Sequence, residues 1–500
     1  MEGLRVALIM LAEIPARGAA KHGRDAWAIR HGDDVITWGE LAARSLRRAH
    51  ALRERGLGVG DLVTLALPNG SHIYEWLFAL WRIGATPHVV SYRLPEAELR
   101  AIIEVAKPAM VVASDPHLQS SLGAFAADLG SDCDDLSPLE PVLADNWKAM
   151  SSGGSTGRPK IIVSPGPNAF DDEKKPPLRF PSEGPILATG PIYHNMPMTT
   201  NLQALFEGHP VIGMERFDPE EALRLIDEHS IAWTSFVPTM MMRISRLPEA
   251  VRSKYDVSSL KTVWHWAAPM PPELKQEWID WLGPETIWEL YGGTEGIVTA
   301  ILNGTEWLEH RGSVGRAVGS EIKIVDDEGT EVPQGEIGEI FALPASGAGS
   351  TYSYIGAERR TIAGGFETIG DFGWMDDEGY LYIADRRTDM IVSGGANVFP
   401  AEVEGALMAH PAVAEAVVIG LPDSDLGARV HAIVQVVEDL EAHGLDEPDS
   451  ETLVAFLRER IVTYKIPRSF EFTRQRLRDD AGKVRRQQLR EDRLTQVAVS

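Results

Sequence analysis

The chain carries Ser151-Ser152-Gly153-Gly154-Ser155-Thr156-Gly157-Arg158-Pro159-Lys160, directly followed by the β-branched run Ile161-Ile162-Val163. That run predicts a strand, and the loop before it holds three glycines, four hydroxyls and a terminal Arg–Lys pair. Glycine lets backbone N–H groups close on phosphate oxygens, and hydroxyls can donate hydrogen bonds to the same oxygens. The stretch therefore predicts a polyphosphate-binding loop that leads into a sheet.

This loop is not a Walker A motif, because no Gly-Lys-Ser/Thr follows at the required spacing. Its alternative interpretation is a flexible surface turn that ends in a solvated Lys160, since Gly/Ser clusters are common in loops. Partners elsewhere in the chain decide between the two interpretations.

Composition indicates an ordinary globular protein with an acidic surface. A chain of 500 residues divides into about two to four domains, and its hydrophobic content is 44%. Lys and Arg number 48 against 73 Asp and Glu, a net charge of −25 that argues against nucleic-acid binding. The single Cys133 excludes a disulfide framework and a thiolate metal site, so we expect a reducing cytoplasm and an inert thiol.

Two local stretches stand apart from this background. The apolar segment Leu4 to Leu11 is interrupted by Arg5; it is too short and too charged to span a bilayer, and it predicts an amphipathic first helix. Residues 458–490 hold 11 Lys/Arg and 4 Asp/Glu. This basic run predicts either an anion-facing patch or a solvated helix face.

Strand and helix patterns alternate along most of the chain. The expected strands include Asp61–Leu67, Ile186–Ala188 and Thr262–Trp264, and the expected helices include Leu41–Arg55, Tyr74–Gly84, Glu96–Ala106 and Glu220–Glu228. Such alternation predicts an α/β fold with layered, largely parallel sheets.

The texture changes twice towards the C-terminus. We expect an N-terminal domain over residues 1–385, which ends in a small β-rich subdomain at about 312–385, then a hinge at 386–388. A smaller, mobile α+β domain follows over 389–500, with a helix that opens at Pro400 and strands at Ala414–Ile419 and His431–Val437.

Further motifs carry nucleotide chemistry. Tyr291-Gly292-Gly293-Thr294-Glu295-Gly296 follows the expected strand Thr286–Leu290 and offers an aromatic ring, two glycines, a hydroxyl and a carboxylate. Those groups suit a purine, a phosphate and Mg²⁺. Asp371 lies where a carboxylate can accept hydrogen bonds from the hydroxyls of a ribose. Gly482-Lys483 lies in the basic run.

The order and spacing of these motifs resemble the acyl-adenylate-forming superfamily, which includes acyl-CoA synthetases, adenylation domains of peptide synthetases, and luciferases. The resemblance extends from Val35 to Lys483, nearly the whole chain. Within the superfamily, these motifs most resemble bile-acid and steroid-acid CoA ligases, on residues 152–157, 306–307, 312–316 and 385–390.

The resemblance implies a nucleotide site. It assigns the β- and γ-phosphates to Gly154, Ser155, Thr156, Gly157 and Lys160, and the adenine to Tyr291 and the wall Ala267-Ala268-Pro269. It implies that Thr294 contacts the α-phosphate, that Glu295 binds Mg²⁺, and that Asp371 and Arg386 hold the ribose.

It also implies an acid site and a CoA site. His194 matches the position beside the substrate carboxylate, with a structural histidine as the alternative, and Lys483 matches the lysine that bridges carboxylate and α-phosphate. Gly394 and Gly395 would line the pantetheine tunnel after the C-terminal domain turns. Mg²⁺, ATP and CoA are the implied cofactor and cosubstrates.

Four positions depart from the family pattern. Thr388 replaces the usual Asp or Lys at the hinge, and Ser164 follows the phosphate-loop strand where Gly is common. Trp264 and Trp266 flank His265 where smaller residues are usual; they predict either a platform for a ring system or ordinary core packing.

The sequence therefore predicts an acid–CoA ligase that forms an acyl-adenylate from a bulky, bile-acid-like or steroid-like carboxylic acid. The alternatives are a fatty-acid or aryl-acid CoA ligase, an adenylation enzyme that loads a carrier protein in trans, and an idle nucleotide-binding regulator. The expected partners are the small-molecule acid, ATP and CoA, and no nucleic acid is expected. We expect no transmembrane segment in the chain, and a homodimer is a further expectation.

Overall fold

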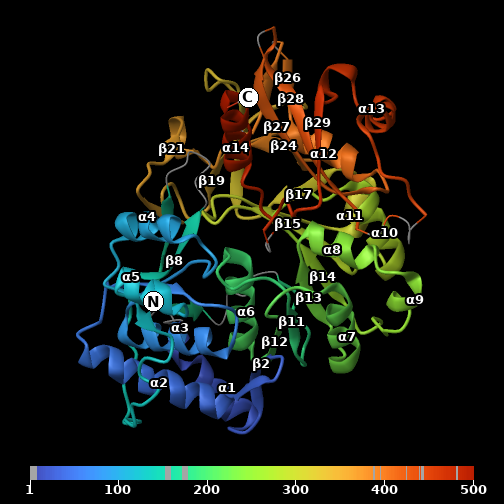
Figure 1. Ribbon diagram of the computed structural model, residues 1–500. Helices are drawn as coiled ribbons and strands as arrows, with labels where there is room; N and C mark the ends of the chain where they lie inside the picture. Colours follow the sequence, from blue (N-terminus) through green and yellow to red (C-terminus); the bar gives the residue numbers. More distant parts are fainter. Residues whose placement is uncertain are drawn as a thin grey trace.

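The computed structural model describes residues 8–152, 159–171, 178–386, 389–394, 396–423, 425–438, 440, 444–479 and 482–499. Two large sheets are built from strands between Trp27 and Arg386. The described residues from Asp389 onward, called the C-terminal residues below, lie above these sheets in the orientation of Figure 1. No helix in these described ranges combines the length and the hydrophobicity that a bilayer crossing needs.

The first sheet has seven strands in the order β20-β9-β8-β5-β4-β6-β7. Its strands are β4 (Leu62–Ala66), β5 (Thr86–Val89), β6 (Met110–Ala113), β7 (Phe125–Ala126), β8 (Asn146–Ser152), β9 (Lys160–Pro165) and β20 (Ser353–Ile355). The inner strands pair in parallel, whereas β9 is antiparallel to both β8 and β20. The edge strand β20 thus comes from a distant part of the chain.

The second sheet has 15 strands and changes from parallel to antiparallel along its length. Its parallel part contains β2 (Trp27–His31), β11 (Ile186–Ala188), β12 (Val211–Gly213), β13 (Trp233–Phe236), β14 (Thr262–His265) and β15 (Ile287–Gly292), with β3 (Asp34–Thr37) at the edge. Its antiparallel part contains β16 (Thr299–Asn303), β17 (Ser313–Ala317), β18 (Ser320–Val325), β19 (Gly338–Pro344), β21 (Arg360–Thr361), β22 (Glu367–Thr368), β23 (Asp371–Met375) and β24 (Leu381–Arg386).

Helices cover both faces of these sheets. They are α1 (Ile14–His22), α2 (Trp38–Glu54), α3 (Ser71–Ile83), α4 (Glu96–Ala106), α5 (Pro116–Leu122), α6 (Asn195–Glu207), α7 (Pro219–His229), α8 (Pro238–Ser245), α9 (Glu249–Arg252), α10 (Pro272–Leu282) and α11 (Gly304–Glu309), with short 3₁₀ turns at Leu11–Glu13 and Ala363–Gly365. Side chains of α3 and α6 share one hydrophobic core with both sheets, and α6 lies between the sheets in Figure 1.

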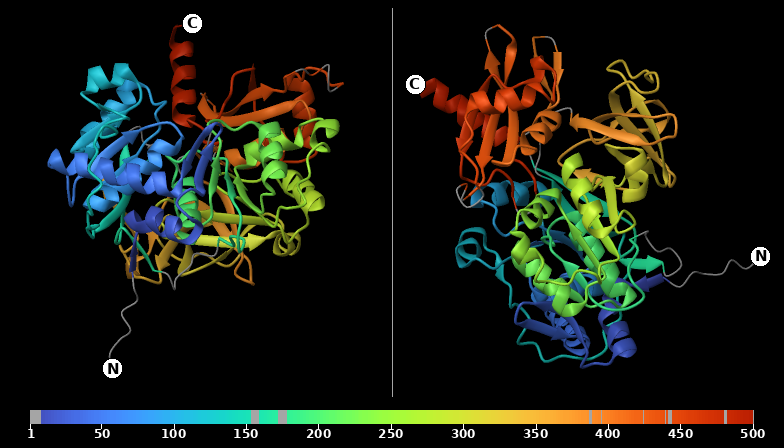
Figure 2. Two further views of the ribbon diagram at one scale, coloured as in Figure 1. Left: turned by 90° about the horizontal axis from the view of Figure 1, so that it is seen from below. Right: turned by 90° about the vertical axis from the view of Figure 1, so that its right-hand side faces the viewer.

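The described C-terminal residues build three further cores of their own. They contain β25 (Ile391–Ser393), β26 (Ala396–Val398), α12 (Pro400–Met408), β27 (Val413–Asp423), β28 (Gly427–Val436), α13 (Ser450–Arg458), β29 (Ser469–Thr473) and α14 (Arg486–Val499), with a 3₁₀ turn at Thr463–Lys465. Leucines of α14 pack on β27 and β28, and the rest of α14 projects outward in both views of Figure 2.

These observations confirm the predicted α/β class, but one local expectation is wrong. Instead of a helix over Leu4 to Leu11, Leu8–Met10 form strand β1, which pairs with β10 (Ala169–Asp171). Strand pairing fits this segment because Ile9 is buried between neighbours that are more exposed. The first α-helix begins only at Ile14, where Pro15 occupies its first turn.

Candidate active site

Lys160, the last residue of the predicted phosphate loop, opens strand β9 and points its amine at a carboxylate. Its Nζ lies 3.1 Å from Oε1 of Glu295, and the hydroxyl of Tyr354 donates a 2.7 Å bond to the same oxygen. The Lys160 amine also donates to the Tyr354 hydroxyl at 2.9 Å. Gly154, Ser155, Thr156 and Gly157 lie outside the described residues.

Glu295 occupies a tight turn directly after β15. The turn closes with a 3.1 Å bond from the Gly296 amide to the carbonyl of Gly293, and half-buried Thr294 lies within it. Burial alone would raise the pKa of Glu295, but the charge of Lys160 and the Tyr354 hydroxyl outweigh burial and lower that pKa. Glu295 is therefore an ionised carboxylate with a built-in counter-charge.

A second network joins Tyr291, Asp371 and Arg386. The Tyr291 hydroxyl donates to one oxygen of Asp371 at 2.7 Å, and Nε of Arg386 donates to the other at 3.2 Å. Asp371 and Arg386 are opposite each other in the β23–β24 pair, so the sheet register places them together. The predicted adenine and ribose residues are thus adjacent, which the sequence spacing alone did not establish.

The predicted adenine wall Ala267-Ala268-Pro269 leaves β14 beside this network. Parallel pairing sets His265 of β14 opposite Glu289 of β15, so the wall reaches the level of Tyr291. Ala267 is exposed and has φ +74°, a left-handed conformation that favours glycine. Ala267 therefore adopts, at a steric cost, a conformation that glycine adopts freely.

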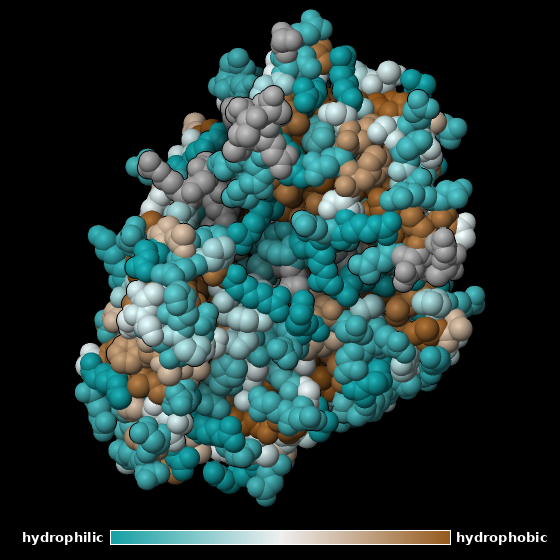
Figure 3. Space-filling view, in the orientation of Figure 1, coloured by the Kyte–Doolittle hydropathy of each residue, from teal (hydrophilic) through white to brown (hydrophobic). Residues whose placement is uncertain are grey.

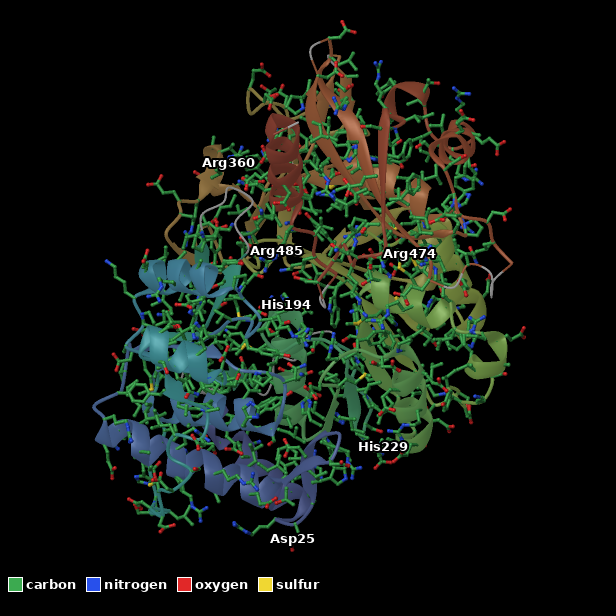
Figure 4. All side chains as sticks on the ribbon, in the orientation of Figure 1. Asp25, His194, His229, Arg360, Arg474 and Arg485 are labelled. Atoms are coloured by element: carbon green, nitrogen blue, oxygen red, sulfur yellow. The ribbon has the colours of Figure 1, made fainter. Side chains whose placement is uncertain are left out.

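His194 is the N-cap residue of α6, and it lies at the end of α6 nearest the C-terminal residues in Figure 4. Burial and the nearby positive charge of Lys483 lower the pKa of His194 to about 3, so the imidazole is neutral at pH 7. In the described part of the protein its Nε2 is buried and has no hydrogen-bond partner. A buried nitrogen of this kind suits a hydrogen bond with a ligand better than a structural role.

Lys483 reaches the same region from the C-terminal half. Its amide donates to Asp479 Oδ1 at 2.9 Å, and the preceding Gly482 has φ +74°. A Cβ on Gly482 would lie 3.3–3.4 Å from Thr239 and Val237, so this turn sits against the start of α8. The structure therefore shows the orientation in which Lys483 faces the predicted nucleotide site.

Electrostatics agree with that placement. The Lys483 side chain is exposed, yet the surrounding protein removes enough water from its amine to lower the pKa of Lys483 below the ordinary value. The positive charge of Arg386 also lowers this pKa, whereas the charges of Asp479 and Glu295 raise it. Hydrophilic residues gather where the C-terminal residues meet the two sheets (Figure 3). The predicted lysine, histidine and carboxylate thus converge on one region.

Other predicted residues have different surroundings. Gly394 is exposed and has φ +58°, and its amide donates to the carbonyl of Leu426 at 2.9 Å. Gly395 and Thr388 lie outside the described residues. The fully buried Trp264 donates to the carbonyl of Leu178 at 2.9 Å, and Trp266 is buried in the same core, as the core-packing alternative predicts.

Ion pairs neutralise much of the basic run. The buried Glu404 binds both Arg478 and Arg486, and the latter also pairs with Asp389. Three more pairs join Lys465 to Glu402, Arg474 to Glu447 and Arg485 to Glu98. These contacts favour a structural role for the run over an anion-facing patch.

Sequence reasoning missed two polar side chains near these residues. Tyr354 comes from the edge strand β20, and no local motif marks it. Lys148 of β8 is 3% exposed; its amine donates to Thr199 at 2.9 Å and to Asn195, the residue after His194. For Lys148, the sequence offers one signal, which is the position of a charged residue inside a segment with the periodicity of a strand.

Comparisons with known proteins agree with the geometry. Residues 16–349 match the family described as AMP-binding enzyme, and residues 402–483 match the AMP-binding enzyme C-terminal domain. A feruloyl-CoA synthase from Amycolatopsis is 32% identical over 94% of this chain and 96% of its own length. A 2-succinylbenzoate–CoA ligase from Bacillus licheniformis is 30% identical, with coverage of 93% and 96%.

A fatty acid–[acyl-carrier-protein] ligase from Streptomyces coeruleorubidus is also 30% identical, with 91% of both chains covered. Among solved structures, o-succinylbenzoate CoA synthetase from Bacillus subtilis with its acyl-adenylate intermediate has a TM-score of 0.78 at 26% identity, over 95% of this chain and 97% of that one. The same synthetase with ATP and magnesium ion has a TM-score of 0.77 at 26% identity, with 95% and 99% covered.

Proposed function

The chain belongs to the family of AMP-binding enzymes, and on that premise we propose that it joins an aryl carboxylic acid to CoA through an acyl-adenylate. The observation that carries the proposal is the convergence of Lys483, His194 and Glu295 on one region of the structure. ATP and CoA are the proposed cosubstrates, and Mg²⁺ is the proposed metal, because a solved CoA synthetase of similar fold binds ATP with magnesium ion.

The substrate class departs from the first expectation of a bile acid or steroid. The relatives described above act on ferulate, 2-succinylbenzoate and fatty acids, so they favour the aryl-acid or fatty-acid alternative. Burial of Trp264 and Trp266 in the core also leaves no exposed indole platform for a steroid ring system. Nothing in these relatives supports the expected homodimer, which is not part of the proposal.

Adenylation needs charge neutralisation at two anions. A carboxylate oxygen attacks the α-phosphorus of ATP, a P–O bond forms, and pyrophosphate leaves with the electron pair of the broken bond. Lys483 brings a compact positive charge to both anions, and its lowered pKa reflects the cost of holding that charge without an anionic ligand. The neutral His194 can donate one hydrogen bond to the acid without adding repulsion to Lys483.

The metal and phosphate groups fit the opposite side of the site. Mg²⁺ in nucleotide sites commonly binds one or two carboxylates and the phosphate oxygens, and Glu295 supplies an ionised carboxylate of the right kind. When bound, the metal neutralises the phosphates. Lys160 lies beside Glu295, at the end of the phosphate loop, where its charge faces the departing pyrophosphate.

Thioester formation follows at the same carbonyl. The CoA thiolate attacks the activated carbonyl carbon, the C–S bond forms, and AMP leaves with the bonding pair. Lys483 occupies this region in the observed orientation, so a turn of the C-terminal residues is required to admit the thiol. Gly394 and Gly395 are the proposed tunnel residues after that turn.

A second candidate is a ligase that transfers the acyl group to a carrier protein. One relative at 30% identity is a fatty acid–[acyl-carrier-protein] ligase. The two candidates differ in the thiol that accepts the acyl group, which belongs to CoA in the first and to a carrier protein in the second. The first half-reaction is the same in both cases.

The direct test is pyrophosphate release with purified enzyme, Mg·ATP and a panel of acids. Ferulate and other cinnamates, benzoates, fatty acids of graded length and cholate separate the classes. We expect release with aryl acids first, followed by discharge of the acyl-adenylate by CoA. Release only with cholate would overturn the aryl-acid proposal, and discharge by a phosphopantetheinylated carrier but not by CoA would favour the second candidate.

A further inference from the structure

Tyr354 touches both charged residues of the proposed metal–phosphate site. Its hydroxyl donates to Oε1 of Glu295 at 2.7 Å and accepts from Nζ of Lys160 at 2.9 Å. The Lys160 Nζ also lies 4.3 Å from the centre of the Tyr354 ring, a cation–π distance. One tyrosine therefore offers this lysine two separate contacts.

The sheet explains how this contact forms. Tyr354 of β20 is opposite Ile162 of β9 in the antiparallel register, and Lys160 lies two residues before Ile162. Residues two apart on a strand share a face, and a diagonal cross-strand neighbour is within reach of a long side chain. Tyr354 is thus fixed by backbone pairing and not by the charges that it contacts.

The Glu295 side chain is 8% exposed, and one of its oxygens, Oε1, receives both Lys160 and Tyr354. A buried carboxylate requires a counter-charge when no ligand is present. Lys160 meets that need in the observed structure at 3.1 Å. A divalent cation on the same carboxylate would repel the ammonium at that distance.

We propose that Lys160 is the resident counter-ion of Glu295 before metal–nucleotide binds, and that Tyr354 is the positioning residue that retains Lys160 when Mg²⁺ takes over the carboxylate. On release from Glu295, the ammonium keeps the hydroxyl and the ring face of Tyr354 and stays turned to the phosphates. This inference rests on the proposed function, because it requires a Mg·ATP site at Glu295.

The test measures binding in the absence of any acid, so it does not depend on the identity of the substrate. Calorimetry gives the dissociation constant of Mg·ATP for the wild type, Tyr354→Phe, Lys160→Met and the double variant. Tyr354→Phe keeps the ring and removes only the hydroxyl. We expect its dissociation constant to rise about tenfold, the effect of one charge-assisted hydrogen bond.

The matched control is Tyr255→Phe. Tyr255 also donates to a glutamate, Glu220 at 2.9 Å, but on α7 at the surface. We expect this variant to bind Mg·ATP within about twofold of the wild type. Melting temperatures of all variants establish that they are folded.

The double variant separates positioning from a general effect. If Tyr354 acts through Lys160, its substitution should change the Mg·ATP affinity by less than about twofold in the Lys160→Met background. A full tenfold loss in that background would overturn the inference.

A second readout uses Mn²⁺ without nucleotide, followed by electron paramagnetic resonance. Lys160→Met should bind Mn²⁺ about tenfold more tightly than the wild type, because the competing ammonium is gone. Unchanged Mn²⁺ affinity would also overturn the inference. Failure of the wild type to bind Mg·ATP at all would instead remove the proposed function, so the two failures are distinct.

Discussion

Nη1 of Arg246 donates a 3.0 Å hydrogen bond to the carbonyl oxygen of Ala414, and this bond ties the end of α8 to β27 in the C-terminal part. A second nitrogen of the same guanidinium donates to the neighbouring carbonyl of Val413 at 2.5 Å. Both bonds hold the C-terminal residues in the orientation that presents Lys483 to the site, and a turn of those residues would break them.

Arg246→Met should therefore weaken adenylation more than thioester formation. Loss of the two bonds is worth about 1.4 kcal/mol, which predicts about tenfold slower pyrophosphate release. Thioester formation from supplied acyl-adenylate should stay within about twofold, because it needs the other orientation. Arg224→Met, which removes a guanidinium that pairs with Glu221 and Glu228 of the same helix α7, is the control. Equal losses in both half-reactions would contradict the assignment of Arg246 to one orientation.

Lys483→Ala should separate the half-reactions further. Removal of a charge that faces both reacting anions predicts a fall of about a hundredfold or more in pyrophosphate release. Thioester formation from supplied acyl-adenylate should lose less than about tenfold. Stopped-flow measurement of each half-reaction gives both numbers. Lys465→Ala, which removes an amine that pairs with Glu402 at 2.6 Å, should match the wild type in both.

Ala267→Gly should not carry the usual cost of glycine. The left-handed conformation at φ +74° penalises Ala267 by about 1–2 kcal/mol, and this offsets the entropy cost of glycine. The neighbouring Ala268 has no positive φ, so Ala268→Gly should lower the free energy of unfolding by about 0.5–1 kcal/mol. Denaturant melts should rank Ala267→Gly at least as stable as the wild type; a rank below Ala268→Gly would refute the strain.

Lys148 predicts a pH dependence of stability. Burial lowers its pKa from 10.5 to about 7, so between these values the unfolded chain binds a proton that the folded chain does not. Unfolding free energy should therefore rise with pH from 7 towards 10, by about 1.4 kcal/mol per pH unit from this group. Below pH 7 the lysine is charged in both states, so the free energy of unfolding no longer changes with pH through this group, and the folded state bears the full cost of the buried charge.

Lys148→Met should flatten that slope, because the variant has no amine to titrate. Urea unfolding at pH 7, 8 and 9 measures it directly. Lys254→Met, at an exposed position after α9, should retain the slope of the wild type. An unchanged slope in Lys148→Met would show that other groups dominate this pH range.

Local patterns predicted those elements whose stabilising contacts are close in sequence. Helix α4 has the predicted bounds Glu96–Ala106, and β11 has the predicted bounds Ile186–Ala188. The start of the chain was mispredicted because Leu8–Met10 pair with Ala169–Asp171, far along the sequence. An apolar run does not reveal whether its partner is the next turn of a helix or a distant strand.

The candidate site divides in the same way. Lys160, Tyr291, Glu295 and Lys483 lie in motifs whose residues are neighbours in sequence, so a resemblance can identify them. Tyr354 and Arg246 act through contacts across the sheet and between the two parts of the chain. Those contacts are products of tertiary structure, and no spacing rule predicts them.

Strand β20 also has a consequence for synthesis on the ribosome. The seven-stranded sheet is almost complete once Pro165 has emerged, but its edge strand β9 waits for Ser353–Ile355, about 190 residues later. At translation rates of about 5–20 residues per second, the open edge persists for about 10–40 s. An unpaired strand edge is a template for aggregation. Nascent chains that stop short of Ser353 should therefore depend on chaperones far more than the full-length chain does.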